Sequence, residues 1–257
     1  MASALDPSTR PDADRSVTSA LVRPKRLYLA RRKPALTRDQ FRARWRQHGN
    51  LAMSFMARQN WENVTAYIHF DPLREASGIA GASDDYDAIG WIRFKDIEAR
   101  KRHVQFAEAR AVLEADEDEF FAARVNTTGM VTFETTLRDG PPNGVTKFCF
   151  LKRKHELTPD EFAEHWANRH APLLLNAVPS VQRYAQNHPL PPEKGGAWGM
   201  GCDGVEESWF ASLDDLKAAH AASAMKEVDA DRRRFVQDCV VVIARQVVLY
   251  PSETSNE

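Results

Sequence analysis

Two stretches of the chain repeat one pattern: LTPDEFAEHW, which runs from Leu157 to Trp166, and LTRDQFRARW, which runs from Leu36 to Trp45. Each has a threonine three residues before a glutamate or glutamine, which is the spacing of a capping box at the start of a helix. Each then has phenylalanine and tryptophan four residues apart, which makes one helix face apolar. The repeat therefore predicts that the same helix, packed in the same way, occurs twice.

Further matching residues follow both stretches in the same order. The pairs are Val64 and Val181, Tyr67 and Tyr184, Asp87 and Asp203, and Phe94 and Phe210. In each copy an apolar run precedes the helix, two strand-like segments follow it, and a charge-rich helical stretch leads to a final β-branched strand. This order is that of a ferredoxin-like unit. We predict an α+β protein of two fused ferredoxin-like (βαββαβ) repeats, whose sheets pack face to face into a barrel with room for a ligand.

The domain boundaries follow from composition. Residues 1–22 mix serine, aspartate, proline and arginine without periodicity and are expected to be a mobile tail. The first repeat is predicted to span residues 23–137 and the second residues 145–250. Residues 138–144 are rich in turn-forming residues and are the expected linker. Residues 251–257 form a second, shorter tail.

The overall composition excludes several classes of protein. Lysine and arginine number 35 and aspartate and glutamate 36, so no basic excess indicates nucleic-acid binding. No apolar run is long enough for a membrane helix, and no signal peptide is visible, so we expect a cytoplasmic protein that binds neither membrane nor nucleic acid. The three cysteines lie far apart without metal-ligand spacing, and no nucleotide motif is present. We therefore expect no cofactor and no metal.

The second half resembles the EthD-like family of the dimeric α+β barrel superfamily. The residues that carry the resemblance are Leu157 to Phe162, His165-Trp166, Arg169 to Leu173, Arg183-Tyr184, Asn187-His188, Asp203 to Val205, Glu207 and Trp209-Phe210. The resemblance implies that the two repeats form an intramolecular dimeric α+β barrel, with a further homodimer as an option. It leaves the chemistry open, because that superfamily includes monooxygenases, isomerases, cyclases, dehydratases, decarboxylases and haem proteins.

His170 is the first candidate for a catalytic residue. Phe162, Trp166 and His170 are spaced four residues apart and share one helix face, so the imidazole is expected to border a cavity. Pro172 predicts a break in the helix next to it. Histidine is suited to proton transfer near neutral pH, and the family motif also has a histidine here. The structural alternative is a core histidine whose ring nitrogens are satisfied by the backbone.

The first half departs from the second at this position. Counting along the repeat places Gly49 opposite His170, whereas His48 lies one residue earlier, on another side of a regular helix. Either a one-residue deletion brings His48 into register, or this copy has lost the group. We favour the loss, which predicts one competent pocket, in the second half, and one degenerate pocket. The alternative is that Gly49 enlarges a pocket and His48 lies at the surface.

Tyr184 and His188 alternate along one strand, and Tyr67 is the counterpart of Tyr184. If this face points into the barrel, both residues join His170 as catalytic groups. The alternatives are a packing tyrosine and a solvated histidine at a strand end.

The alternation of the next strand predicts that Trp91, Arg93, Glu207 and Trp209 point into the barrel. Buried charges need partners, so an ion pair between Arg93 and Glu207 is the structural explanation, and an aromatic pocket with charged anchors the functional one. The residues expected to touch substrate are Trp166, Glu207, Trp209, Arg93, Trp91, Tyr67 and His48.

From these features we expect a cofactor-free lyase or isomerase. It would act by general acid/base catalysis, with dehydration, decarboxylation or ring rearrangement as the reaction, on a small aromatic or polyketide-like molecule. One alternative is a monooxygenase or a haem-binding member of the superfamily, with His170 as the axial ligand. The other is a non-catalytic small-molecule binding or accessory protein.

Overall fold

Eight strands form one closed antiparallel barrel in the computed structural model, which describes residues 24–58, 63–76, 78–79, 81–105, 107–190 and 201–250. Around the barrel the strands are ordered β1-β3-β2-β8-β5-β7-β6-β4. Strands β2 and β8 pair with each other, as do β4 and β6, so the N-terminal half (β1 to β4) and the C-terminal half (β5 to β8) are joined along two seams. The tails predicted over residues 1–22 and 251–257 lie outside the described residues.

The N-terminal half contains four strands and its own helices. Their bounds are β1 Pro24–Ala30, α1 Arg38–Arg58, β2 Val64–Pro72, the short 3-10 turn η2 Arg74–Ala76, β3 Ala88–Phe94, α2 Ile97–Val104, α3 Ala107–Glu117 and β4 Gly129–Arg138. The C-terminal half has the same order of strands and helices. Its bounds are β5 Val145–Arg153, α4 Pro159–His165, the π-helical turn η3 Trp166–His170, α5 Ala171–Ala177, β6 Arg183–Pro189, β7 Gly204–Phe210, α6 Leu213–Ala221, α7 Met225–Phe235 and β8 Val236–Tyr250.

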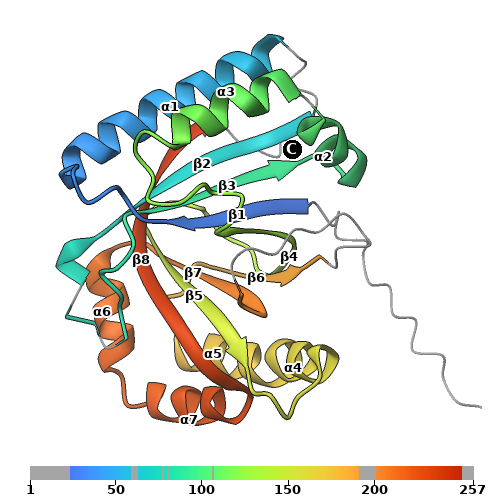
Figure 1. The fold of residues 1–257 in the computed structure, drawn as a ribbon. Helices are drawn as coiled ribbons and strands as arrows, with labels where there is room; N and C mark the ends of the chain where they lie inside the picture. Colours follow the sequence, from blue (N-terminus) through green and yellow to red (C-terminus); the bar gives the residue numbers. More distant parts are fainter. Residues whose placement is uncertain are drawn as a thin grey trace, which may run out of the picture.

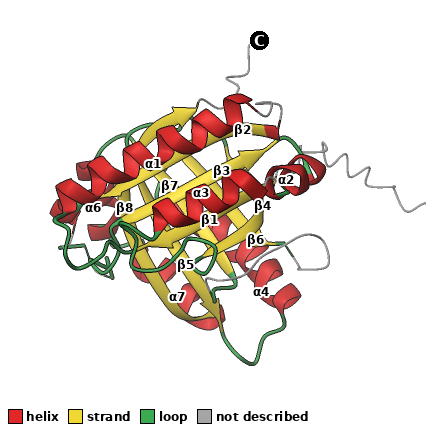
Figure 2. Cartoon of the chain, turned by 45° about the horizontal axis from the view of Figure 1, so that its top comes forward, coloured by secondary structure: helices red, strands yellow, loops and turns green. Residues whose placement is uncertain are grey.

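The helices lie outside the barrel in two groups. Helices α1, α2 and α3 cover the strands of the N-terminal half, and α4 to α7 cover those of the C-terminal half on the opposite side (Figure 1). Turned by 45°, the molecule shows α1 and α3 side by side across the strands beneath them (Figure 2). Each strand therefore has one face toward the barrel interior and one toward a helix layer, and a site can lie in the interior or in either layer.

Both helices of the repeated pattern begin at the predicted capping box. The Thr158 hydroxyl accepts from the backbone N–H of Glu161, whose carboxylate accepts from the backbone N–H of Thr158. Thr37 and Gln40 make the same two hydrogen bonds at the start of α1. Each pair satisfies two backbone donors that a helix start otherwise leaves unpaired.

The barrel interior is occupied by buried side chains. Leu27, Leu29, Phe70, Phe148 and Trp209 belong to one apolar cluster inside it. The α+β class and the barrel agree with the prediction from sequence, but the expected space for a ligand between the two sheets is filled by this cluster. Within the residues described, no helix combines the length and the hydropathy that a membrane crossing requires.

Candidate functional site in the N-terminal helix layer

A cavity of about 370 Å³ lies between the N-terminal sheet and its helices α1, α2 and α3. It lies where the buried apolar residues of this layer divide into two clusters. One surrounds Phe41 and Trp45, and the other surrounds Met56 and Phe94. Apolar side chains such as Phe55, Met56, Ile92 and Leu113 form much of its wall.

A histidine–aspartate pair stands at this cavity. His48 lies on α1, borders the cavity and is 5% exposed. Its Nδ1 is 2.8 Å from the Oδ2 atom of Asp116 on α3, and Asp116 also accepts hydrogen bonds from Arg44. Burial acts to raise the pKa of Asp116, but the hydrogen bonds from Arg44 and His48 hold it below its usual value. Since an ionised carboxylate only accepts, His48 Nδ1 carries the hydrogen and Nε2 keeps a free lone pair.

The structure corrects the prediction that the first half has lost the equivalent of His170. His170 bonds to Asp231 of α7 as His48 bonds to Asp116 of α3, with Nδ1 to Oδ2 at 3.0 Å. The C-terminal helix has one more residue between tryptophan and histidine, and the π-helical turn η3, which runs from Trp166 to His170, absorbs it. The helix then continues into α5, so the predicted break at Pro172 is also wrong. Gly49 instead leaves room for Leu249 and His69, because a Cβ there would lie 2.6 Å from Leu249 Cδ1 and 3.0 Å from His69 Cε1.

A chain of hydrogen bonds leads to the hydroxyl of Tyr67, which lines the cavity together with Tyr28. Arg46 donates to His69 Nδ1 at 2.8 Å, so His69 Nε2 carries the hydrogen and donates to the hydroxyl of Tyr67 at 2.9 Å. The hydroxyl of Tyr28 accepts from Trp45 Nε1 at 3.1 Å. It donates to no described side chain, so its proton is available to the cavity.

The electrostatics of the cavity favour uncharged side chains at neutral pH. Burial lowers the pKa of His48 and raises the pKa of Glu117, which faces His48 with Oε1 3.9 Å from Nε2. Burial raises the pKa of Tyr28 to about 12. His48 is therefore a neutral base near pH 7, and Tyr28 is a neutral donor.

In the C-terminal half the corresponding groups are enclosed by protein. His170 is 1% exposed, its Nε2 lies 4.0 Å from Glu206 Oε2, and Glu206 also accepts from the Tyr184 hydroxyl at 3.0 Å. Burial acts to raise the pKa of Glu206, but Arg232 and Lys147 hold it below its usual value. The ionised Glu206 thus takes the hydroxyl proton of Tyr184, whereas no described side chain accepts the hydroxyl proton of Tyr28 in the other half.

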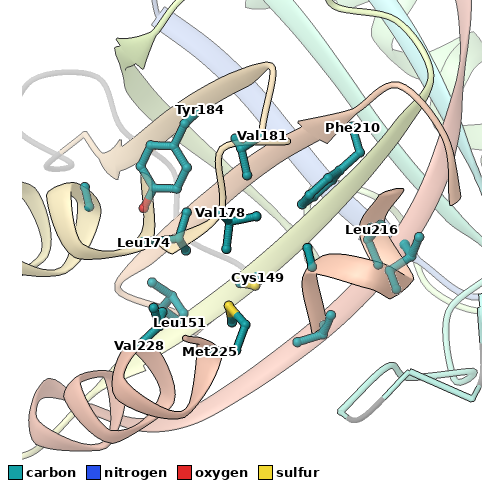
Figure 3. Packing of buried hydrophobic residues seen from close by; sticks show 14 of the residues in the cluster. Cys149, Leu151, Leu174, Val178, Val181, Tyr184, Phe210, Leu216, Met225 and Val228 are labelled. Carbon is teal, nitrogen blue, oxygen red and sulfur yellow. The ribbon is translucent and has the colours of Figure 1, made fainter. Parts of the chain in front are cut away.

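The rest of this C-terminal layer is packed with apolar side chains. Figure 3 shows Leu174 and Val178 beside Tyr184, with Cys149 and Leu151 of β5 beneath them and Met225 and Val228 of α7 closing the lower side. His170 is not among the residues that line the 370 Å³ cavity. The cavity therefore lies in the opposite half from the one predicted to hold the competent pocket.

One cross-strand pair accounts for much of the difference between the two layers. Tyr28 of β1 pairs with Gly90 of β3, and Cys149 of β5 pairs with Glu206 of β7. A Cβ at Gly90 would overlap the ring of Tyr28, so the glycine is what allows the tyrosine to lie across the sheet. In the C-terminal half the large and small residues are exchanged, and the large one is a buried carboxylate.

The remaining predicted site residues lie away from the cavity. Trp91, Glu207 and Trp209 point into the barrel as expected, and Arg93 pairs with Glu134 rather than with Glu207. The partner of Glu207 is Lys25, which is fully buried and bridges the Oε1 atom of Glu207 at 2.6 Å and the Oε2 atom of Glu134 at 2.5 Å.

Tyr184 and His188 face the helices, not the barrel, because strand alternation puts them on the opposite side of the sheet from Glu207. Trp166 is buried and donates to Tyr184 at 3.1 Å, and the His188 ring packs on Trp166. Of the residues expected to touch substrate, His48 and Tyr67 line the cavity and the other five do not.

Reasoning from sequence missed several residues of the site. Tyr28 and Arg26 lie on the first strand, whose alternation marks them as facing the same side as the helix. Asp116 and Glu117 are adjacent at the end of α3, and Asp116 corresponds to Asp231 in the second copy. A comparison of the carboxylates of the two copies is the signal that could have found this pair.

The chain belongs to the EthD family. The family model described as the EthD domain matches residues 33–124 and 154–238, which together cover more than half of the chain. This finding confirms the resemblance identified from the sequence. No curated protein matches the chain.

Solved structures share the fold at low sequence identity. A protein from Fusobacterium nucleatum provisionally named a monooxygenase is similar with a TM-score of 0.58 and 12% identity, over 90% of this chain and 94% of that one. An anthrone oxidase-like protein has a TM-score of 0.58 and 11% identity, over 91% and 97%. A protein provisionally named a chlorite dismutase has a TM-score of 0.53 and 12% identity, over 88% and 95%. At these identities the likeness defines the fold alone.

His170, the expected axial ligand, fits a haem poorly. An axial ligand needs open space beyond Nε2, but His170 is 1% exposed and its Nε2 faces Glu206 at 4.0 Å. The iron would have to lie where this buried carboxylate is. Among the residues that the structure describes, no group of three or more histidine, cysteine, aspartate or glutamate side chains could hold a metal ion.

Proposed function

We propose that this EthD-family protein is a cofactor-free lyase or isomerase whose active site is the cavity of the N-terminal half. It abstracts a proton from a small aromatic or polyketide-like molecule that has a C–H group made acidic by a carbonyl, either directly or through an aromatic ring. The observation that carries the proposal is the orientation of His48, which is held by Asp116 with a free Nε2 lone pair at a 370 Å³ cavity.

His48 acts as the general base. The C–H proton moves to Nε2, and the electron pair of the broken bond moves onto the substrate carbonyl oxygen. The imidazolium that forms is stabilised by the carboxylate of Asp116 on its other nitrogen. Arg44 donates to the same carboxylate and keeps it ionised, so Asp116 orients the ring without taking the proton.

Tyr28 supplies the hydrogen bond for the oxygen on which charge develops. Its hydroxyl lines the cavity, and the hydrogen bond from Trp45 Nε1 holds the oxygen in place. A donor that is oriented before the reaction stabilises the enolate at little reorganisation cost. Return of the proton from His48 to another carbon completes an isomerisation, and expulsion of a β-hydroxyl group as water completes a dehydration. Glu117, with its raised pKa, is placed to supply a proton in the second step.

The test is deuterium exchange into anthrone, whose methylene group is acidic and adjacent to the aromatic ketone system. We expect the full-length protein to accelerate exchange in D₂O under nitrogen, as followed by NMR. His48→Gln should slow the catalysed exchange by about 10²- to 10⁴-fold, the usual loss on removing a general base. His170→Gln, which alters the enclosed counterpart, is the matched control and should stay within a few fold of wild type. Saturable binding without exchange would identify a binding protein instead, and equal losses in the two variants would refute the assignment to the N-terminal half.

A second candidate is a cofactor-independent monooxygenase that starts with the same proton abstraction. It is favoured by the fold-level likeness to the provisionally named monooxygenase of Fusobacterium nucleatum and to the anthrone oxidase-like protein. Here dissolved O₂ would take electrons from the carbanion, one oxygen atom entering the product and the other leaving as water. Oxygen consumption in an electrode, in step with loss of anthrone, separates this reaction from isomerisation, which consumes none.

We further propose that the chain arose from two ferredoxin-like repeats, residues 23–137 and 145–250, joined by residues 138–144. The repeated order of strands and helices and the shared capping boxes support this division. We propose a small aromatic molecule as the partner, with neither nucleic acid nor membrane involved.

A further inference from the structure

Two arginines that line the cavity of the N-terminal half make no ion pair with any residue that the structure describes. Arg26 of β1 lines the cavity and is half-buried, and Arg100 of α2 lines it from the other side of the layer. Neither side chain makes an ion pair or hydrogen bond within the described part of the chain, and the buried Nε of Arg100 is without an acceptor. Burial, followed by the charge of Arg26, lowers the pKa of Arg100, so the two cations lie close enough to repel each other.

Other arginines at this site behave differently. Arg110, which also lines the cavity, bonds to Glu114 at 2.7 Å, and Arg44 bonds to Asp116. Two half-buried like charges that lie near each other without a counter-ion are unfavourable when the cavity is empty. The pair Arg26–Arg100 is therefore arranged for a negative charge that no described residue provides as an ion pair or hydrogen bond.

The net charge of the cavity lining indicates the charge of the ligand that would suit it. Arg110 is neutralised by Glu114, and Asp116 is neutralised by Arg44. With His48 and Glu117 neutral, the remaining charged groups are Arg26 and Arg100. They leave positive charge that a carboxylate bound between them would offset.

Arg26 also lies near the groups of the proposed reaction. Its charge acts on the pKa of His48, Tyr28 and Glu117. An anion bound to Arg26 would thus be held beside the base and the donor, while the rest of the molecule lies against the apolar wall that includes Phe55, Met56 and Leu113.

We propose that the cavity binds a small apolar molecule bearing one carboxylate, and that Arg26 and Arg100 hold this carboxylate. Guanidinium groups bind planar carboxylates through paired N–H donors, and such charge-assisted hydrogen bonds are strongest away from water. The inference names the substrate class of the proposed function and rests on it for the identity of the site. Binding itself is measured without any turnover.

The probes are 2-naphthoate and 2-naphthamide, which share a ring system and differ in charge. Calorimetry with the full-length protein at pH 8 should give a Kd for naphthoate about 10- to 100-fold lower than for the amide, the range for charge-assisted hydrogen bonds. Arg26→Met and Arg100→Met should each remove most of this preference, and Arg26→Lys should restore part of it. Arg110→Met is the matched control from the same cavity and should change the preference by less than about threefold, because its charge is already paired.

His48→Gln separates this inference from the proposed function. It should slow anthrone exchange by about 10²- to 10⁴-fold and retain a preference for naphthoate over the amide. If wild-type protein fails to exchange anthrone protons but prefers naphthoate, the catalytic proposal fails and the binding proposal stands. Absence of naphthoate binding, equal Kd values for acid and amide, or a preference that survives in the folded Arg26→Met/Arg100→Met double variant would overturn the carboxylate site.

Discussion

The two helix layers of this barrel have the same frame and opposite interiors. In both, a tryptophan of the covering helix donates to a tyrosine of the sheet, and a histidine of that helix bonds to an aspartate of the helix beside it. In the N-terminal layer these groups border a cavity, whereas in the C-terminal layer Glu206 and a continuous apolar cluster enclose them. The comparison teaches that the histidine–aspartate pair belongs to the frame, and that the space beside it decides where chemistry can occur.

Substitution of Gly90 gives the strongest test of why the two layers differ. Gly90→Ala places a Cβ in the ring of Tyr28, which must move away from Trp45 or into the cavity. We expect the free energy of unfolding to fall by about 1–3 kcal/mol, the usual cost of overpacking, and the exchange activity to fall with it. Denaturant titration measures the first effect and NMR the second.

The matched control for Gly90 is Gly78, where an added Cβ would meet no atom within 4 Å. Gly78→Ala should change the free energy of unfolding by less than about 0.5 kcal/mol. Equal effects of the two substitutions would show that contact between Tyr28 and the sheet does not shape the N-terminal layer.

The sequence was sufficient to predict the features that depend on local spacing. The capping boxes of Thr37 and Thr158, the α+β class and the inward direction of Trp91 and Glu207 follow from helix and strand periods that neighbouring residues enforce. The family membership was likewise predicted from short motifs of the second half and is confirmed.

The location of the cavity could not be predicted in the same way. An α-helical period cannot place His170 opposite His48, because the π-helical turn η3 changes the period over five residues. The partners Asp116 and Asp231 lie more than 60 residues from their histidines in the sequence, so only tertiary structure brings them together. The two layers also differ in one cross-strand pair, which is Tyr28–Gly90 in the open layer and Cys149–Glu206 in the closed one. Both pairs are compatible with a strand, so strand patterns do not show which layer is open.

The pH dependence of the free energy of unfolding compares the two layers at their histidines, His48 and His170. Burial lowers the pKa of both His48 and His170, so the folded protein binds fewer protons than the unfolded chain below the unfolded pKa of about 6.5. The stability that each neutral histidine contributes is therefore fully present above that pH. The free energy of unfolding decreases as the pH falls toward the folded pKa values, by up to about 1.4 kcal/mol per pH unit for each such histidine.

Replacing either histidine by glutamine should remove the proton that this histidine takes up on unfolding, and with it that histidine's share of the pH dependence of the free energy of unfolding. Denaturant titrations between pH 5 and 7 should therefore show a slope reduced by a similar amount in His48→Gln and His170→Gln, although only the first variant loses exchange activity. A slope that His170→Gln leaves unchanged would mean that this imidazole is charged in the folded protein, and that the C-terminal layer is not a neutral counterpart of the N-terminal one.

The capping boxes give the smallest and most symmetrical expectation. Thr37→Ala and Thr158→Ala each remove the hydroxyl that accepts the N–H at the third helical position, and each leaves the side chain of Gln40 or Glu161 without its hydroxyl neighbour. Both should lower the free energy of unfolding by about 1 kcal/mol in a denaturant titration. Neither threonine lines the cavity or bonds to His48. The exchange rate of folded protein should therefore not change in either variant. Unequal losses of stability would show that the two layers already differ at the start of their helices, and the divergence would then extend beyond the few side chains around Gly90 and Glu206.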